Sequence, residues 1–256
     1  MTHNTHDIVI IGAGLTGLTT AFALRNKGRN VTILESADRV GGQIQSHHVN
    51  GFVFESGPNT GVIKYPQVMD LFHSLDDKCE LEIAKESAKK RLIWKGNKFH
   101  ELPSGPISAI TTPLFTTYDK LRILTEPFRA KGNNPDESIA QMTKRRLGSS
   151  YLNYAVDPFL AGVYAANPMM LPTRYALPKL YELEQNYGSF ILGAIKKARQ
   201  PKTDRDKTAT KEVFSTRGGL SNLTKAMADK IGSDNIILNT KSISITPSEG
   251  GFVIDY

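Results

Sequence analysis

The chain has 256 residues, of which 39% are hydrophobic and 22% are charged, and its formal net charge at pH 7 is +7. This composition excludes a disordered tail, and no apolar run reaches the roughly 18 residues that a membrane-spanning helix needs. The single cysteine, Cys79, excludes an internal disulfide framework and a cysteine-rich metal centre. The polar start of the chain has no signal-peptide pattern, so we expect a cytoplasmic protein.

The positive charge is concentrated between Lys196 and Lys211, where seven basic residues stand against two acidic ones. Such a stretch is typical of a solvated loop, with a site for lipid headgroups or for a partner as the alternative. No zinc-finger, helix-turn-helix or RNA-recognition pattern accompanies it, so we expect no nucleic-acid partner. The six histidines lack the spacing of metal ligands, and we expect no metal site.

The first 35 residues predict a strand, a helix and a second strand in succession. Residues 7–11 and 30–35 are apolar and β-branched, as in strands buried on both faces, and residues 18–27 favour a helix. Two strands joined by a helix in this way run parallel. We therefore predict an α/β fold with a Rossmann-type domain built on a parallel sheet.

Beyond residue 57 the pattern becomes mainly helical, and an α/β pattern returns near the end. The remaining predicted elements are a helix over 65–77, a hairpin over 92–100, helices over 119–130, 138–147, 150–159 and 177–197, a strand over 213–215, a helix over 222–231, and strands over 235–246 and 252–256. This order predicts a nucleotide-binding domain that is split by a helical insertion. The predicted segments are 1–65 and 211–256 for that domain, 66–100 for part of a substrate domain, and 101–210 for the insertion.

A glycine motif follows the first predicted strand. It fits the pattern G-x-G-x-x-G and consists of Gly12, Ala13, Gly14, Leu15, Thr16 and Gly17. Gly12 permits a tight turn, Gly14 lets a pyrophosphate approach the backbone, and Gly17 lets the helix pack closely on the strand. Glu35, at the end of the second strand, is placed to bind ribose hydroxyls. Because strand, helix, strand and acid are all present, we predict a dinucleotide site rather than an ordinary glycine turn.

A second glycine pair, Gly41 and Gly42, lies in the segment from Ser36 to Gln43, which also contains Arg39. This segment resembles the FAD signature of the flavin amine oxidase superfamily, in which an acid is followed by Arg-x-Gly-Gly-Arg. Gln43 stands where that signature commonly has its second arginine. The resemblance implies FAD rather than a nicotinamide cofactor.

Three further segments resemble the protoporphyrinogen oxidase family in particular. They are Glu55–Thr60, Leu102–Pro106 and Asp157–Pro168, which are similar to the family's Gly-Pro-Asn-Ser/Thr stretch, its Leu-Pro-Ser/Thr-Gly turn and its Pro-Phe-x-x-Gly-Val-Tyr/Phe-Ala-Gly-Asp/Asn stretch. The resemblance covers almost the whole chain and corresponds to the N-terminal half of family members. We therefore expect the C-terminal half to be absent here, and we expect this chain alone to bind FAD weakly and to lack oxidase turnover.

The resemblance also implies which residues contact FAD. Besides the glycine motif and Glu35, they are Ser36, Arg39, Gly41, Gly42, Gln43, Gly57, Pro58, Asn59, Thr60 and Ser242. Ser242 lies in a predicted strand and would offer backbone groups to adenine. The flavin performs the redox chemistry, so no side chain is expected to be catalytic.

The implied reaction is oxidation of protoporphyrinogen IX to protoporphyrin IX in haem biosynthesis, with oxygen as the acceptor. Arg91 is expected to pair with a propionate of the tetrapyrrole, although a surface arginine in a basic run is the simpler alternative, and Gly162 is expected near the pyrroles. The alternative functions are coproporphyrinogen III oxidation, a related amine oxidase or desaturase, and a non-catalytic flavin-binding or porphyrin-binding module. Peripheral membrane contact through the insertion and a homodimer are further expectations.

Overall fold

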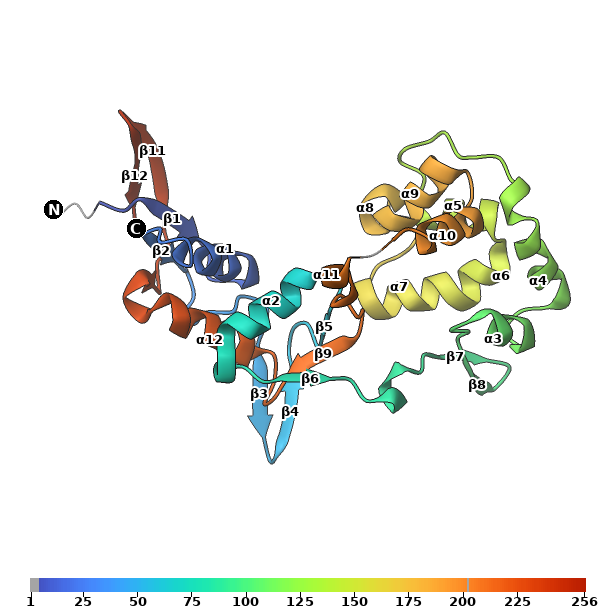
Figure 1. The fold of residues 1–256 in the computed structure, drawn as a ribbon, viewed down its shortest axis with the longest axis horizontal. Helices are drawn as coiled ribbons and strands as arrows, with labels where there is room; N and C mark the ends of the chain where they lie inside the picture. Colours follow the sequence, from blue (N-terminus) through green and yellow to red (C-terminus); the bar gives the residue numbers. More distant parts are fainter. Residues whose placement is uncertain (1–4, 202) are drawn as a thin grey trace. The chain divides into compact units, whose positions relative to one another are not determined.

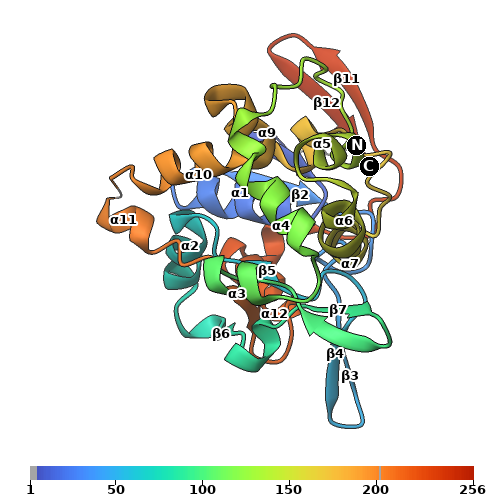
Figure 2. The ribbon, with the colours of Figure 1, turned by 90° about the vertical axis from the view of Figure 1, so that its right-hand side faces the viewer.

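The computed structural model describes residues 5–201 and 203–256, which form two compact units (Figures 1 and 2). Unit 1 contains the chain up to residue 85 and the chain from residue 203 onward, and unit 2 contains residues 86–201. The predicted functional segments divide the chain after residues 65, 100 and 210 instead, and that functional division remains a prediction. Lys202, within the basic stretch, lies outside the described residues.

Unit 1 combines an α/β layer with short antiparallel sheets. Its helices and strands are β1 (Ile8–Ile11), α1 (Leu15–Arg25), β2 (Val31–Leu34), β3 (Ser46–Val49), β4 (Phe52–Glu55), β5 (Gly61–Val62), α2 (Pro66–Leu75), β6 (Leu81–Ile83), α11 (Asp204–Lys207), β9 (Val213–Thr216), α12 (Ser221–Ile231), β10 (Ile236–Ile237), β11 (Ser244–Ser248) and β12 (Gly251–Asp255).

The core of unit 1 lies between the parallel sheet and two helices. The strand order is β1-β2-β10, and Ile33 of β2 pairs with Ile10 on one side and Ile236 on the other. Every residue of β2 is buried, as its unbroken apolar and β-branched composition predicts. Leu18 of α1 and Met227 of α12 are fully buried in the same cluster; α1 packs on the sheet and α12 packs against α1.

Unit 2 is mainly helical and has a small core of its own around Leu114 and Phe115. Its helices and strands are β7 (Leu92–Lys95), β8 (Lys98–Glu101), α3 (Pro106–Thr111), α4 (Thr117–Leu124), α5 (Ile139–Arg146), α6 (Ser149–Tyr151), α7 (Asp157–Tyr164), α8 (Thr173–Ala176), α9 (Pro178–Tyr187) and α10 (Phe190–Ala198). A π-helical turn over Leu152–Val156 joins α6 to α7, so the predicted helix over 150–159 is part of a longer helical run.

The structure confirms the predicted βαβ unit, with β1 and β2 parallel, and the hairpin that turns at Gly96 and Asn97. Three predicted elements are wrong. The helix over 119–130 ends at Leu124, the last residue of α4, and a short 3-10 helix follows over Glu126–Phe128. The helix over 177–197 is two helices, because Gly188 adopts a left-handed conformation (φ 71°) and Ser189 begins the next helix by accepting a hydrogen bond from the Leu192 amide. The strand over 235–246 is interrupted by an irregular segment at 238–243, which contains Asn239 at φ 63°.

Candidate functional site

The glycine motif forms the connection between β1 and α1 in unit 1. The Gly12 amide donates a hydrogen bond to the Leu34 carbonyl at 2.7 Å, and Gly12 has a φ of +96°, which favours glycine. A Cβ atom at Gly17 would lie 1.9 Å from the Gly12 carbonyl oxygen. The turn and the close contact between helix and strand therefore both require the glycines that the motif supplies.

The start of α1 has unfilled space and no side-chain acceptor. A Cβ atom at Gly12 or Gly14 would meet nothing within 4 Å. Gly14 is the N-cap without a side-chain hydrogen bond, and the first turn of this 11-residue helix contains no acidic residue. The first intrahelical bond runs from the Leu18 amide to the Gly14 carbonyl, so the amides from Gly14 to Gly17 have no partner within the helix and can face an anion. These features fit the diphosphate of a dinucleotide.

Glu35 is buried and holds the glycine motif in place. One carboxylate oxygen accepts from the Ala13 amide at 2.6 Å, and the other accepts from the Ala37 amide at 2.8 Å and the Ser36 hydroxyl at 3.2 Å. Burial raises the pKa of Glu35, but these hydrogen bonds outweigh it and the net shift is downward. A carboxylate has about four lone-pair positions, so it retains capacity for the ribose hydroxyl, which remains a prediction.

The second glycine pair lies directly beside the first motif. The Gly41 amide donates to the Ala13 carbonyl at 2.8 Å, and a Cβ atom at Gly42 would lie 3.1 Å from the Gly14 Cα. Arg39 donates to the Gly42 carbonyl at 2.8 Å and makes longer bonds to two other carbonyls of the same turn, so its side chain positions the turn. Gln43 is exposed.

Two other predicted segments reach the same region from different parts of the chain. A Cβ atom at Gly57 would lie 1.8 Å from the Gln43 carbonyl oxygen, so the segment that continues with exposed Pro58, Asn59 and Thr60 begins against the second glycine turn. The other segment contains Ser242.

The segment that carries Ser242 contacts the end of β2. The Thr240 amide donates to the Glu35 carbonyl at 2.9 Å. Ser242 itself is exposed in the irregular segment, so its predicted place in a strand is wrong. The buried hydroxyl of Thr240 has no hydrogen-bond partner among the described residues. An unpaired buried hydroxyl beside Glu35 also fits a site that is completed by a polar ligand.

Sequence reasoning missed Thr240 because it carries no motif and is brought to Glu35 only by backbone pairing. It also missed Ser46, whose hydroxyl donates to Glu55 at 2.8 Å while the Leu220 amide donates to the same carboxylate at 2.8 Å. These bonds join the β3–β4 hairpin to the start of α12. The glycines Gly218 and Gly219 just before α12 were the only local signal.

The two residues expected at the substrate lie in unit 2. The guanidinium of Arg91 lies 5.2 Å from the ring centroid of Phe159, a cation–π contact, and Arg91 is exposed. Phe159 and Gly162 both belong to α7, and a Cβ atom at Gly162 would meet nothing within 4 Å. The structure therefore brings Arg91 to the helix that contains Gly162.

Replacing Glu35 with glutamine tests its role in the glycine motif. We expect a loss of about 1–3 kcal/mol in unfolding free energy, because an amide group cannot accept from both buried backbone donors. The folded-state pKa lies below the ordinary 4.5, so this stability is complete above pH 4.5 and is lost as the pH falls through the folded value. Urea unfolding at pH 7 and at a series of lower pH values measures it, with exposed Asp38→Asn as the control. A loss that grows as the pH falls below 4.5 would contradict the assignment.

Comparison with known proteins places the chain among flavoproteins. The family described as flavin containing amine oxidoreductase matches residues 15–256. The chain is 31% identical to protoporphyrinogen oxidase 2 of Arabidopsis thaliana, over 95% of this chain and 51% of that protein. It is 28% identical to coproporphyrinogen III oxidase of Staphylococcus aureus, over 98% of this chain and 57% of that protein.

Solved structures agree with this relationship at the level of the fold. Cyclohexylamine oxidase from Brevibacterium oxydans matches with a TM-score of 0.65 and 17% identity, over 98% of this chain and 55% of that chain. The chain spans about half the length of the curated relatives it matches. The glycine motif after β1, its contacts with the second glycine pair and the match over nearly the whole chain lead to one conclusion: the chain belongs to the flavin containing amine oxidoreductase family.

Proposed function

We propose that this chain provides the dinucleotide-binding and helical parts of an FAD-dependent porphyrinogen oxidase. The proposed reaction is oxidation of protoporphyrinogen IX to protoporphyrin IX in haem biosynthesis, with oxygen as the acceptor. The observation that carries the proposal is the packing of three separate chain segments in succession: Gly42 lies against Gly14 at the uncapped start of α1, and Gly57 lies against Gln43. The similarity to protoporphyrinogen oxidases over 95% of the chain supports this choice of substrate.

The residues of unit 1 would hold FAD through backbone groups for the most part. The first amides of α1 would bind the diphosphate, Glu35 the ribose, and the backbone near Ser242 the adenine. The segments containing Gly42 and Gly57 would accommodate the rest of the cofactor. When bound, FAD supplies the capacity to accept two electrons from the tetrapyrrole. The protein's own task in this scheme is to bind and orient.

The isolated chain provides a direct test of how complete this site is. We expect a purified 256-residue chain to bind FAD weakly and to show no oxidase turnover, because its relatives are about twice as long. The absorbance spectrum after gel filtration and anaerobic mixing with each porphyrinogen measure both properties. A chain that is purified yellow and oxidises a porphyrinogen would contradict the expectation of an incomplete site.

Arg91 is the proposed partner of a substrate propionate. We expect Arg91→Ala to weaken protoporphyrin IX binding by roughly tenfold, the effect of losing about 1.4 kcal/mol from one charge-assisted pair. Quenching of porphyrin fluorescence measures the affinity, and Lys98→Ala removes a charge elsewhere in unit 2 as the control. Equal affinities for Arg91→Ala and the control would remove Arg91 from the site.

Coproporphyrinogen III is the second candidate substrate. A relative of 28% identity carries that name, and its substrate has four propionates rather than two. Titration with coproporphyrin III alongside protoporphyrin IX compares the two, and tighter binding of coproporphyrin III would favour this alternative.

Peripheral membrane contact through unit 2 is a further part of the proposal. Ile107 and Ile110 of α3 are 80% and 71% exposed, and Phe128 is 89% exposed. Large apolar side chains at such exposure are typical of surfaces that meet a partner or a lipid layer. The helices of the described ranges are all too short or too polar to cross a membrane. Co-sedimentation with phosphatidylcholine vesicles tests the contact, while the cytoplasmic location and the homodimer remain predictions.

A further inference from the structure

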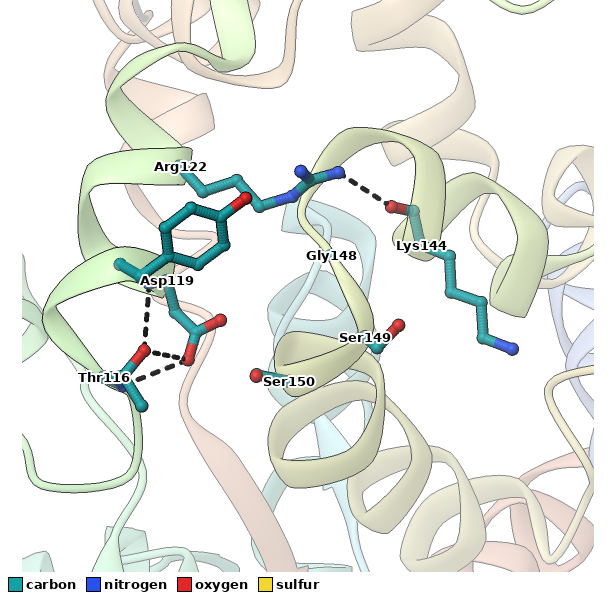
Figure 3. A pocket seen from close by; sticks show the side chains of 8 residues that line it. Thr116, Asp119, Arg122, Lys144, Gly148, Ser149 and Ser150 are labelled. Carbon is teal, nitrogen blue, oxygen red and sulfur yellow. Dashed lines mark hydrogen bonds between the residues drawn. The ribbon is translucent and has the colours of Figure 1, made fainter.

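A pocket with a volume of about 480 Å³ lies within unit 2, between α4 and the turn that joins α5 to α6 (Figure 3). Arg122 reaches it from α4, Lys144 comes from α5, Gly148 belongs to the turn, and Ser149 begins α6. None of these residues belongs to the proposed flavin or porphyrin site.

The charge of the pocket is positive. Arg122 and Lys144 carry positive charge, and Asp119 is the acidic residue of the lining, so the formal sum is +1 (2 − 1). Within residues 5–201 and 203–256, no ion pair joins either basic residue to a carboxylate. The two basic groups are therefore available to an anion.

Asp119 is occupied by its own capping interactions. Its carboxylate accepts from the Thr116 amide at 3.1 Å and from the Thr116 hydroxyl at 2.8 Å. Burial raises the pKa of Asp119, but hydrogen bonds from the Thr116 and Ser150 hydroxyls outweigh it, so the carboxylate stays ionised at neutral pH. Asp119 thus fixes the start of α4, and among the described residues it makes no ion pair with Arg122.

Arg122 is held in one position before any ligand arrives. Its Nη2 donates to the Lys144 carbonyl at 3.3 Å. A Cβ atom at Gly148, which has a φ of +103°, would lie 2.7 Å from the Arg122 Nε, so only glycine lets the guanidinium lie against this turn. A guanidinium fixed in this way loses little conformational entropy when it binds an anion. Its Nε is buried and has no hydrogen-bond partner within the described ranges.

We propose that this pocket binds a phosphate group, which belongs either to a phosphorylated small molecule or to a lipid headgroup. A planar guanidinium, an ammonium and the Ser149 hydroxyl are a set of donors that suits phosphate oxygens. The volume exceeds that of phosphate alone and lies within the range of about 300–1,000 Å³ typical of ligand sites. Tyr118, which also lines the pocket, is 71% exposed and offers an aromatic wall to the organic part of the ligand.

Calorimetric titration of the full chain with glycerol 3-phosphate and with inorganic phosphate tests the proposal. Lys144→Ala should weaken binding by about tenfold or more, and Arg122→Lys should do so as well because lysine lacks the planar fork. Lys98→Ala, which removes a charge elsewhere in unit 2, should leave the affinity unchanged. The glycine motif of unit 1 can also bind phosphate. Only the part of the binding that the Lys144→Ala substitution removes is therefore assigned to the pocket of unit 2. Circular dichroism melting confirms that the variants are folded.

Vesicle binding distinguishes the two sources of phosphate. Phosphatidylcholine vesicles with and without phosphatidic acid are compared for the wild-type chain and Lys144→Ala. Binding of glycerol 3-phosphate alone identifies a phosphorylated small molecule, whereas Lys144-dependent binding to phosphatidic acid vesicles identifies a lipid headgroup. If neither probe binds, or if Lys144→Ala binds both as well as the wild-type chain does, the pocket is not a phosphate site.

Discussion

Replacing Glu126 with alanine is expected to lower the free energy of unfolding of unit 2 by about 3–5 kcal/mol, because it removes one of the two buried carboxylates that pair with buried Arg146 and leaves only Glu184. Both side chains are fully buried, and two guanidinium nitrogens of Arg146 donate to the same Glu126 oxygen, with Nε at 2.7 Å. Glu126 also accepts from the Ser189 hydroxyl at 2.6 Å and the Phe190 amide at 3.0 Å, at the start of α10. The substitution therefore removes an ion pair and a helix cap together.

Urea unfolding followed by the fluorescence of Trp94, the single tryptophan and a residue of unit 2, measures this loss. Glu182→Ala is the matched control, because its pair with Lys197 spans 3.7 Å with both side chains about half exposed and is worth at most about 1 kcal/mol. A loss no larger than that of the control would show that Arg146 is stabilised without Glu126.

The same network predicts acid sensitivity. Burial raises the pKa of Glu126, but the hydrogen bonds from Ser189, Phe190 and Arg146 outweigh it, so its pKa lies below the ordinary 4.5. The stability from a depressed carboxylate is complete above the unfolded-state pKa and is lost as the pH falls through the folded-state pKa. The difference between the wild-type chain and Glu126→Ala should therefore shrink below pH 4.5 and persist at pH 7.

The second large effect is expected for Gly17→Ala. Alanine within a helix normally stabilises by roughly 0.5–1 kcal/mol relative to glycine. Here the new Cβ would lie 1.9 Å from the Gly12 carbonyl oxygen, and Gly12 is held by its bond to Leu34. The backbone must shift, so we expect a net loss of about 1–3 kcal/mol and a deformed glycine motif.

Thermal unfolding and titration with ADP measure the two consequences of Gly17→Ala. Binding of ADP, which carries the adenosine and diphosphate portion of FAD, should weaken by tenfold or more, a change of about 1.4 kcal/mol or greater. Gly251→Ala is the control, because a Cβ atom there meets nothing within 4 Å and the residue lies outside the site. An unchanged or raised stability of Gly17→Ala would mean that the motif adapts without strain.

The parts of the fold that could be predicted are those with a local cause. Residues 8–34 follow their apolar pattern, because β1 and β2 are short, continuous and separated by a helix that starts at a glycine motif. The hairpin over β7 and β8 follows from Gly96 and Asn97, which adopt positive φ values of 58° and 61°. In these cases neighbouring residues alone determine the conformation.

The parts that could not be predicted depend on residues distant in the chain. Nothing near Thr240 indicates that its amide donates to the Glu35 carbonyl, and the apolar pattern after Ile236 does not show that the strand is interrupted at Asn239. The pairing of Glu126 with Arg146 links residues that are 20 apart and has no pattern of its own. Gly188 carries a local signal for a helix end, which the predicted helix over 177–197 does not take into account.

The candidate site shows the same division. Its position at the start of α1 follows from the glycine motif. The second glycine pair, Gly41 and Gly42, lies beside this motif and makes close backbone contacts with it. No sequence pattern indicates that most hydrogen bonds of the Arg39 and Glu35 side chains join them to backbone groups of the protein. Such roles depend on which carbonyls and amides the fold brings within reach.

The central claim is that the glycine motif binds the diphosphate of FAD through main-chain amides. Two-dimensional NMR of the ¹⁵N-labelled chain, titrated with FAD, tests this most directly, because it detects weak binding at individual amides. We predict that the signals of Gly14, Leu15 and Gly42 shift together in a saturable way, while the signals of α9 in unit 2 stay in place. Saturable shifts elsewhere with none at these amides, or no shifts at millimolar FAD, would contradict the claim.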